Sequence, residues 1–257
     1  MSESEPMVRE IALVADETAT SRCDEGFLRV KRFVLRNTFT DGRTSDTYRC
    51  DVLSRRHVDA VAVVLYSRHP ESGRPIVHYR EGTRPPIWLR RHKQDELPFK
   101  DPAPFDTIGE IVAGVLEETD HDWEGVLRRG AIEAHEEAGY RVAPDAAQAL
   151  GQGGFFPSPG VTDEKVYLVA VEVDPTTRGE AVGDGSVQEQ GTRMVSRDLG
   201  DAVAACRRGE IPDAKTEIGI LRLADLLGYL PQLDLYVHEL PEDLRARYRS
   251  LGVARGS

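Results

Sequence analysis

The stretch from Glu124 to Tyr140, EGVLRRGAIEAHEEAGY, decides the fold of this chain. An apolar stripe recurs through it at intervals of three and four residues, which is the spacing of one helix face. Gly139 follows the stripe and is placed to end the helix in the left-handed conformation that glycine tolerates. The pattern predicts a helix whose small apolar side packs inward, with the stripe formed by Leu127, Ala131, Ala134 and Ala138.

Three glutamates lie on another face of the same predicted helix, at Glu133, Glu136 and Glu137. Residues three or four apart are neighbours on a helix, so we expect these carboxylates to lie together and to point away from the packed side. Like charges at this spacing repel by roughly a few tenths of a kcal/mol per pair. A divalent cation bound by oxygen ligands would offset that repulsion. An acidic face exposed to solvent is the alternative, and the cluster taken alone favours it.

The chain has 257 residues, enough for one large domain or for a domain with an appendage. Its hydrophobic fraction of 40% and charged fraction of 30% are typical of a soluble globular protein. No apolar run reaches the roughly 20 residues that span a bilayer, and the polar, acidic start predicts neither a signal peptide nor a transit peptide. Cys23, Cys50 and Cys206 form no C-x-x-C pair, which disfavours zinc sites and disulfides and favours a cytoplasmic location.

The formal net charge is −11. This charge argues against nucleic acid and against an anionic membrane as partners, because both are polyanions. It does not exclude a small anionic substrate, since a site can contain its own metal ions and arginines.

Apolar patterning predicts an N-terminal hairpin followed by an α/β domain. Residues 27–36 and 47–53 alternate in part and flank the turn signal Asp41-Gly42, which indicates two antiparallel strands. Residues 84–105 are predicted to be a long, proline-bearing loop. Further strands are expected at residues 58–66, 75–80, 107–114, 165–173 and 192–196, and helices at 196–210 and within 211–230. The expected divisions are a loosely attached N-terminus, a β subdomain, the main domain and a C-terminal helix with a tail, at residues 1–26, 27–55, 56–230 and 231–257.

The sequence around the glutamates resembles the Nudix box, G-x5-E-x7-R-E-U-x-E-E-x-G-U, in which U is a bulky aliphatic residue. The glycine of the box corresponds to Gly114 and its first glutamate to Glu124. The resemblance covers about residues 55–220 and implies a Nudix-type α/β/α sandwich with a mixed sheet, preceded by the antiparallel β subdomain. The remaining matches to the box are Glu133, Glu136, Glu137 and Gly139.

Three departures from the box stand out, one of which is that Ala134 and Tyr140 fit its two bulky aliphatic positions only loosely. Ile132 replaces the arginine that, in the family, pairs with acids of the box and holds them in place. Gly114 lies ten residues before Glu124 instead of six, so the loop EETDHDW carries four extra residues. Arg128 and Arg129, one turn earlier, are the candidates to replace the lost arginine.

The chemistry that the resemblance implies is hydrolysis assisted by Mg²⁺ or Mn²⁺, because metal ions neutralise the anionic oxygens that repel a nucleophilic water. Glu133 and Glu137 are expected as direct metal ligands, and Glu136 as a ligand or as an orienting, catalytic group. The backbone carbonyl of Ala113 is a further expected ligand. Glu189, in VQEQG, resembles the glutamate that activates the water in this family.

Other segments resemble the ADP-ribose and nucleotide-sugar pyrophosphatases within the family. YREGTRPP resembles a segment whose arginine contacts the substrate phosphates, with Arg84 as the match and Arg80 as the alternative. Glu110, in GEIVAG, corresponds to an acid of the same group, and FFPSPG resembles its loop after the box. Phe156 is the candidate for contact with the substrate, although packing is the more frequent role of such residues. Packing is also the favoured role of Trp88.

The resemblance therefore predicts a pyrophosphatase that cleaves ADP-ribose or a related nucleoside diphosphate sugar into a nucleoside monophosphate and a sugar phosphate. It also implies a homodimer, because the N-terminal β subdomain of this group is often exchanged between subunits. Two alternatives remain. The first is a Nudix-fold binding or regulatory protein with weak catalysis, which Ile132 favours. The second is a hydrolase of another diphosphate, such as a GDP-sugar or a dinucleoside polyphosphate.

Overall fold

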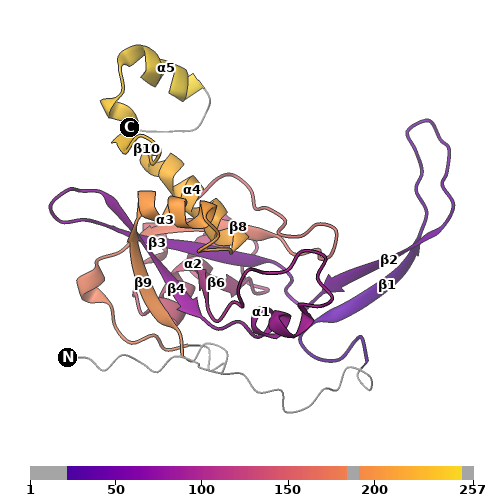
Figure 1. Cartoon of the computed structure of the whole chain (residues 1–257). Coiled ribbons are helices and arrows are strands. Elements are labelled where there is room, and N and C mark those ends of the chain that lie inside the picture. Colours follow the sequence, from indigo (N-terminus) through magenta and orange to yellow (C-terminus); the bar gives the residue numbers. More distant parts are fainter. Residues whose placement is uncertain (1–21, 184–190, 251–257) are drawn as a thin grey trace.

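A computed structural model describes residues 22–183 and 191–250, and in this part of the chain helices cover both faces of a mixed sheet (Figure 1). The seven strands run in the order β5-β4-β3-β8-β7, with β6 also paired to β3 and β9 to β4. β3 and β8 are parallel, and the other pairs are antiparallel. The predicted mixed α/β class is confirmed. The strands are β3 (Ala60–Arg68), β4 (Pro75–Gly82), β5 (Ile108–Glu110), β6 (Val112–Val115), β7 (Ala147–Ala149), β8 (Val166–Glu172) and β9 (Arg193–Asp198).

Strand β3 is central and buried on both faces, as its unbroken apolar sequence predicted. Side chains alternate along a strand, so successive residues of β3 enter two different cores. Val63 packs in the core on the side of helix α2, whereas Val64 packs in the core formed with helices α3 and α4. These helices are α2 (Trp123–Ala138), α3 (Leu199–Arg207) and α4 (Ala214–Leu227).

Helix α2 is the helix predicted from the apolar stripe, and Gly139 ends it with a φ of 77°. At its other end Asp122 caps the helix, because its Oδ1 accepts a hydrogen bond from the N–H of Gly125 at 2.9 Å. Gly130 allows a close approach to the sheet: a Cβ at this position would lie 2.8 Å from Cγ2 of Val169 on β8. Side chains on this face of α2 therefore reach the strands directly.

The segment predicted as one strand at residues 107–114 is in fact two short strands, β5 and β6, separated by Ile111. β5 pairs with β4, whereas β6 pairs with β3. Because β3 and β4 pair only through residues 65–68 and 75–78, the chain can cross from one strand to the other where they separate. Oγ1 of Thr216, on α4, accepts the hydrogen bond of the Ile111 N–H at 2.8 Å. The crossing brings Glu110 beside β4 and Ala113 beside β3.

The two predicted N-terminal strands are present as the antiparallel pair β1 (Arg29–Leu35) and β2 (Tyr48–Ser54), and they project from the body of the molecule (Figure 1). The base of this hairpin attaches to the loop before β8, where the N–H of Leu53 donates to the carbonyl of Val161 at 2.8 Å. A two-stranded ribbon is marginally stable by itself, so this attachment is part of what holds it.

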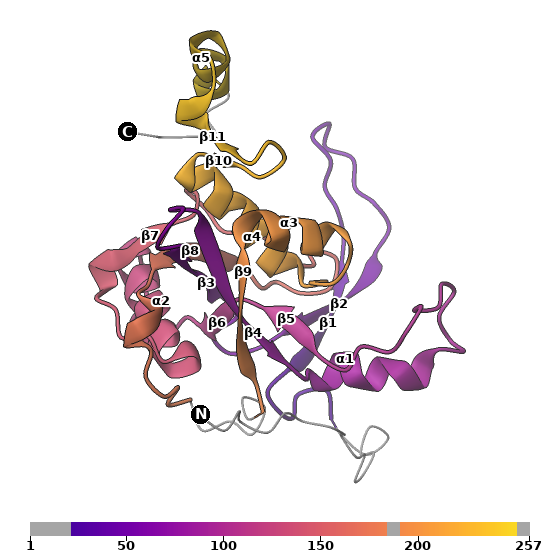
Figure 2. The same cartoon turned by 60° about the vertical axis from the view of Figure 1, so that its left-hand side comes forward.

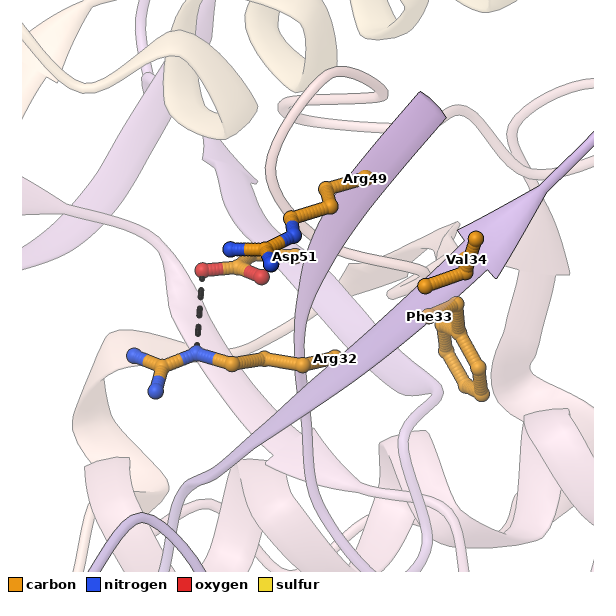
Figure 3. Close-up of a pocket in the computed structure, with 5 residues that line it drawn as sticks. All are labelled: Arg32, Phe33, Val34, Arg49 and Asp51. Carbon is orange, nitrogen blue, oxygen red and sulfur yellow. Dashed lines mark hydrogen bonds and ion pairs between the residues drawn. The ribbon is translucent and has the colours of Figure 1, made fainter. Parts of the chain in front are cut away.

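The hairpin exposes apolar side chains. Phe33 lies opposite Cys50 and Leu35 opposite Tyr48, so the four share one face. Phe33, Leu35 and Tyr48 are 43%, 38% and 43% exposed, respectively. Arg32 pairs with Asp51 at 3.3 Å beside a hollow of about 690 Å³ (Figure 3). The residues around the hollow all come from the hairpin, which makes it a surface concavity: Arg32, Phe33, Val34, Arg49 and Asp51.

Residues 84–105 were predicted to be a loop, and this was wrong at its start. Helix α1 (Pro85–Leu89) and a 3-10 turn (Arg90–Lys93) occupy it, because proline is compatible with the first turn of a helix, where its missing N–H is not needed. Trp88 is 6% exposed, and Cζ of Arg91 lies 3.4 Å from the centre of its ring. Trp88 is therefore a packing residue, in the role that its sequence context favoured.

The C-terminal part continues from α4 into the short pair β10 (Tyr229–Leu230) and β11 (Leu235–Tyr236) and the predicted last helix, α5 (Glu242–Ser250). Figure 2 shows α5 beyond α4, away from the sheet. Within the described ranges, none of the helices has the length and apolar character needed to cross a bilayer. Cys23, Cys50 and Cys206 are free thiols. Further 3-10 turns in the described part of the chain are at Pro144–Ala146, Pro175–Thr177 and Val237–Glu239.

Candidate functional site

Two glutamates of helix α2 pack against strand β6 instead of pointing away from the packed side. Glu133 is only 9% exposed, and a side chain at Gly114 would overlap its carboxylate. Oε2 of Glu137 accepts a hydrogen bond from the backbone N–H of Ala113 at 3.1 Å. The expectation that the acids face outward is wrong for these two residues, because the approach of α2 to the sheet encloses them. The glycine is required here because the carboxylate fills the space of a side chain.

Glu137 forms a buried ion pair with Arg80 of strand β4. Nη1 of Arg80 lies 2.7 Å from Oε1 of Glu137, and the two side chains are 6% and 8% exposed. Nη2 of Arg80 donates to Oγ1 of Thr192 at 3.2 Å. Nε of Arg80 is buried without a hydrogen-bond partner in the described part of the chain. Arg80, the alternative candidate for a phosphate ligand, thus contacts one of the candidate metal ligands.

Arg128 and Arg129, the candidates to stand in for the arginine that Ile132 replaces, bind acids of the loop before the helix. Both donate to Asp120, at 3.0 Å each, and the Asp120 side chain is 1% exposed. Arg129 also pairs with Glu117 at 3.0 Å. The reason lies in the longer loop before the helix: it brings its own buried carboxylate, and the arginines of the first turns bind that group. Their charge serves to hold the loop against α2.

A second charged cluster surrounds Glu110, at the end of β5. Its carboxylate accepts hydrogen bonds from Nε of Arg84 and from Nζ of Lys215, the latter at 2.8 Å. Lys215 also donates to Asp213 at 3.0 Å. Glu110 is 9% exposed, so a single uncompensated charge here would be costly. The cluster joins the residue before α1, the end of β5 and the start of α4, and the start of α4 is remote from the other two in sequence.

The charges in this cluster stabilise one another. Burial opposes the ionisation of Glu110, but the positive charges of Lys215 and Arg84 outweigh it and hold the pKa of Glu110 below its ordinary value. Burial likewise opposes the charge of Lys215, and Glu110 and Asp213 outweigh it, so the pKa of Lys215 is raised. The pKa of Arg84 is raised in the same way against burial, first by Glu110. All three groups are charged at neutral pH.

A cavity of about 360 Å³ is lined by the two strand residues that Glu133 and Glu137 contact and by two residues of this cluster. Ala113 and Gly114 line it together with Asp213 and Lys215, so it connects the box strand with the entry of α4. Nη2 of Arg55 lies 2.8 Å from Oε1 of Glu164 at its edge. The hollow on the hairpin is larger. We take the smaller cavity as the candidate site, because the ion pairs Arg55–Glu164 and Lys215–Asp213 both lie at its wall. The full lining is Arg55, Ala60, Ala113, Gly114, Val115, Pro157, Glu164, Val166, Asp213, Ala214 and Lys215.

The remaining predicted site residues are Phe156, Glu136 and Glu189. Phe156 is 55% exposed, with Nζ of Lys165 at 6.0 Å from its ring centre, whereas its neighbour Phe155 packs against the core. Glu136 is half-buried on α2. Glu189 lies outside the described residues, so its expected role as the water-activating base stays a prediction.

Three residues at the cavity were missed as site residues. They are Arg55, Asp213 and Lys215. The signals available were weak: a lysine and an aspartate in GEIPDAKT, at the start of a helix, fit capping and solvent exposure as well as a site. Only the fold brings Lys215 to Glu110.

No three His, Cys, Asp or Glu side chains in residues 22–183 and 191–250 are grouped so that they could hold a metal ion as they stand. The donor types still suit a hard divalent cation, since Glu133 and Glu137 both reach the backbone at Ala113 and Gly114. Arg80, however, already neutralises Glu137. The metal site therefore remains a prediction, and Glu133, Glu136, Glu137 and Ala113 remain its candidate ligands.

A scan against models of protein families finds no family that matches this chain, and a search of the curated proteins finds no match either. The proposal for function therefore depends on the residues and their geometry.

Proposed function

We propose that this protein is a Nudix-type hydrolase that uses Mg²⁺ or Mn²⁺ to cleave the diphosphate bond of ADP-ribose or a related nucleoside diphosphate sugar. The products would be a nucleoside monophosphate and a sugar phosphate. One observation carries the proposal: Glu133 and Glu137 of α2 converge on Ala113 and Gly114 at the wall of a cavity. The resemblance to the Nudix box implies these same positions.

The metal would be held by Glu133 and Glu137, with Glu136 and the carbonyl of Ala113 as further candidate ligands. When bound, it would neutralise the anionic oxygens of the diphosphate. The described residues add positive charge of their own. The side chain of Arg84 is 38% exposed and is anchored through Nε to Glu110, so its remaining N–H groups can meet a phosphate in a fixed orientation. Lys215 adds a second cation at the cavity wall.

A homodimer follows from the same proposal. The apolar hairpin face, defined by Phe33, Leu35, Tyr48 and Cys50, is more exposed than a monomer needs, and a second copy of the chain would cover it. We place the protein in the cytoplasm, with small-molecule diphosphates instead of nucleic acid or membrane as its partners, because of its acidic charge and free thiols.

A binding or regulatory protein with weak catalysis is the second candidate, and one observation favours it. Glu137 is bound to Arg80 in a dry ion pair, so a metal would have to share this carboxylate. The burial of Glu133 and Glu137 argues against a binding protein. Burying two carboxylates costs free energy, and a metal-dependent reaction would give a reason to keep them. A third candidate keeps the enzyme but changes the substrate to a GDP-sugar or a dinucleoside polyphosphate.

A substrate panel tests these candidates. The full chain is incubated with Mg²⁺ or Mn²⁺ and ADP-ribose, GDP-mannose, UDP-glucose or diadenosine polyphosphates, and phosphate is measured after added phosphatase. We expect turnover of ADP-ribose or a nucleotide sugar that disappears with EDTA and returns with metal. Turnover of none, with nucleotide binding retained in calorimetry, would replace the proposal by the binding protein. Preference for another diphosphate would select the third candidate.

A further inference from the structure

Arg80 is the counter-charge of Glu137, although it comes from a different layer of the fold. It lies on β4, and Glu137 lies on the last turn of α2. Nη1 of Arg80 and Oε1 of Glu137 are 2.7 Å apart, and both side chains are almost fully enclosed. The attraction between two charges buried this deeply is much stronger than in a surface ion pair, because little solvent screens it.

The helix itself offers Glu137 no such partner among its arginines. Arg128 and Arg129 both bind Asp120 of the preceding loop, and Ile132 is apolar. Glu137 is instead fixed at two points, by Arg80 on one oxygen and by the N–H of Ala113 on the other. Two directional contacts on different oxygens define the plane of the carboxylate.

We propose that Arg80 is a positioning residue: it holds the Glu137 carboxylate against the Ala113–Gly114 strand in the orientation that the candidate site needs. The inference rests on the proposed function, because it gives Glu137 a task in which orientation matters. It also separates two roles for Arg80. A residue that contacts substrate phosphate would act by itself, whereas a positioning residue acts through Glu137.

The contacts of Arg80 favour the second role. Nη1 binds Glu137 and Nη2 binds Thr192, so two of its three nitrogen atoms are engaged within the protein. Its side chain is 6% exposed, compared with 38% for Arg84. Arg84 is the arginine that remains accessible to a phosphate, and Arg80 is the one that organises the acid.

A double-mutant cycle tests the proposal with Arg80→Gln, Glu137→Gln and the double variant, each checked for folding by urea denaturation. Glutamine keeps an N–H donor on a shorter side chain and removes the charge. Arg80→Gln should lower kcat by about 100-fold, the size expected for a misplaced catalytic group, and leave KM within about threefold. In the Glu137→Gln background the same change should lower kcat by less than about threefold. Arg80→Lys, which keeps the charge, should recover most of the lost turnover.

Binding of free Mn²⁺, followed by the loss of its solution electron paramagnetic resonance signal, is the second readout. Arg80→Gln should weaken Mn²⁺ binding although it removes a nearby positive charge, since a disoriented ligand outweighs the gain in electrostatics. Arg193→Met is the matched control, because Arg193 also bridges β9 and β4, through Glu81, but is 61% exposed. It should change neither turnover nor Mn²⁺ binding.

The outcomes distinguish the positioning role of Arg80 from the proposed function. Equal or tighter Mn²⁺ binding in Arg80→Gln, with turnover within about threefold of wild type, would make Arg80 a mere counter-ion and overturn the inference alone. A raised KM with additive losses in the cycle would make it a substrate ligand, which also overturns it. If Arg80→Gln does not fold, loss of Mn²⁺ binding in a folded Arg80→Lys would count against it. A wild-type chain that binds no Mn²⁺ and turns over no diphosphate would remove the proposed function and the inference together.

Discussion

Nζ of Lys215 lies 2.8 Å from Oε2 of Glu110, although 105 residues separate them along the chain. The contact ties the entry of α4 to the end of β5, and Arg84 binds the other oxygen of the same carboxylate. Glu110 thus has two cations and little solvent, and its orientation determines where Arg84 points. The candidate site depends on this buried cluster as much as on the glutamates of α2.

Lys215→Met should therefore destabilise the fold. Glu110 would keep Arg84 but lose one charged hydrogen bond, which we expect to lower the free energy of unfolding by about 1–3 kcal/mol. Urea denaturation followed by circular dichroism measures the change. Lys100→Met is the control, because Lys100 and its partner Asp95 are 65% and 101% exposed and their pair should contribute at most about 0.5 kcal/mol. Equal effects of the two substitutions would contradict the role assigned to Lys215.

Glu137→Gln and Arg80→Gln should each destabilise the chain by about 3–5 kcal/mol, because each leaves a buried charge without its partner. The double variant removes both charges, so its loss should be smaller than the sum by at least about 1 kcal/mol. Urea titrations of the four proteins measure this coupling. Strict additivity would mean that the two side chains are not paired in solution.

Glu137→Gln should also abolish most of the proposed activity. The amide has the shape of the carboxylate but cannot supply its charge to a cation, and we expect turnover to fall by at least about 100-fold. The assay is hydrolysis of the best substrate from the panel, at saturating Mg²⁺. Glu242→Gln on α5, whose parent side chain is 71% exposed, should retain full activity. Wild-type turnover in Glu137→Gln would remove this residue from the site.

The pH dependence of stability should show a step from His78. His78 is buried between Ser67 and Ser196, each at 2.8 Å from a ring nitrogen, and burial, followed by the charge of Arg178, lowers its pKa below the ordinary 6.5. The unfolded chain therefore binds the proton first. The stability is complete above pH 6.5 and is lost as the pH falls from there through the folded pKa.

Urea midpoints measured between pH 8 and pH 5 check this step. His78→Gln has no such proton to bind, so its midpoint should fall less over the same range. Glu110, whose pKa is also lowered, keeps its contribution above its ordinary value of 4.5 and loses it only as the pH falls through the lower folded pKa, so the two effects occupy different windows. Parallel pH curves for wild type and His78→Gln would contradict the assignment.

Phe33→Asp should shift the proposed dimer toward a monomer. The substitution places a charge in the apolar hairpin face, between Leu35 on the same strand and Cys50 on the other. Light scattering coupled to size-exclusion chromatography measures the mass. Val34→Asp is the matched control, since Val34 is 69% exposed and points to the opposite side of the ribbon. Equal effects of the two changes, or a wild-type monomer, would remove the hairpin face from the proposed interface.

The parts of the fold predicted well are those with local causes. Helix α2 has its apolar stripe, its terminal glycine and, as the structure adds, the capping Asp122, all within one segment. β3 could be recognised because burial on both faces requires an unbroken apolar run. Helix α1 was missed because its segment was predicted to be a proline-bearing loop, whereas Pro85 and Pro86 occupy the first turn of the helix.

The candidate site could be predicted only in part, because its charges are paired across the fold. The acids of α2 follow from a motif, but their inward direction depends on how closely Gly130 lets the helix approach the sheet. Nothing near Glu137 in sequence indicates Arg80 as its partner, and nothing near Glu110 indicates Lys215. A sequence gives the inventory of charged residues, and the strand order decides which of them meet.

The crossing at Ile111 restricts where residues can be inserted into or deleted from this chain. Two residues, Ile111 and Val112, connect Glu110, which lies opposite Arg80 on β4, to Ala113, which lies opposite Ala62 on β3. Removing or adding one of them would turn every later side chain of β6 to the opposite face and withdraw Ala113 and Gly114 from the glutamates. The loop that follows, anchored by Asp120, has no such constraint. In descendants of this chain, insertions and deletions should therefore occur in the loop after Leu116 and be rare in the segment from β5 to β6.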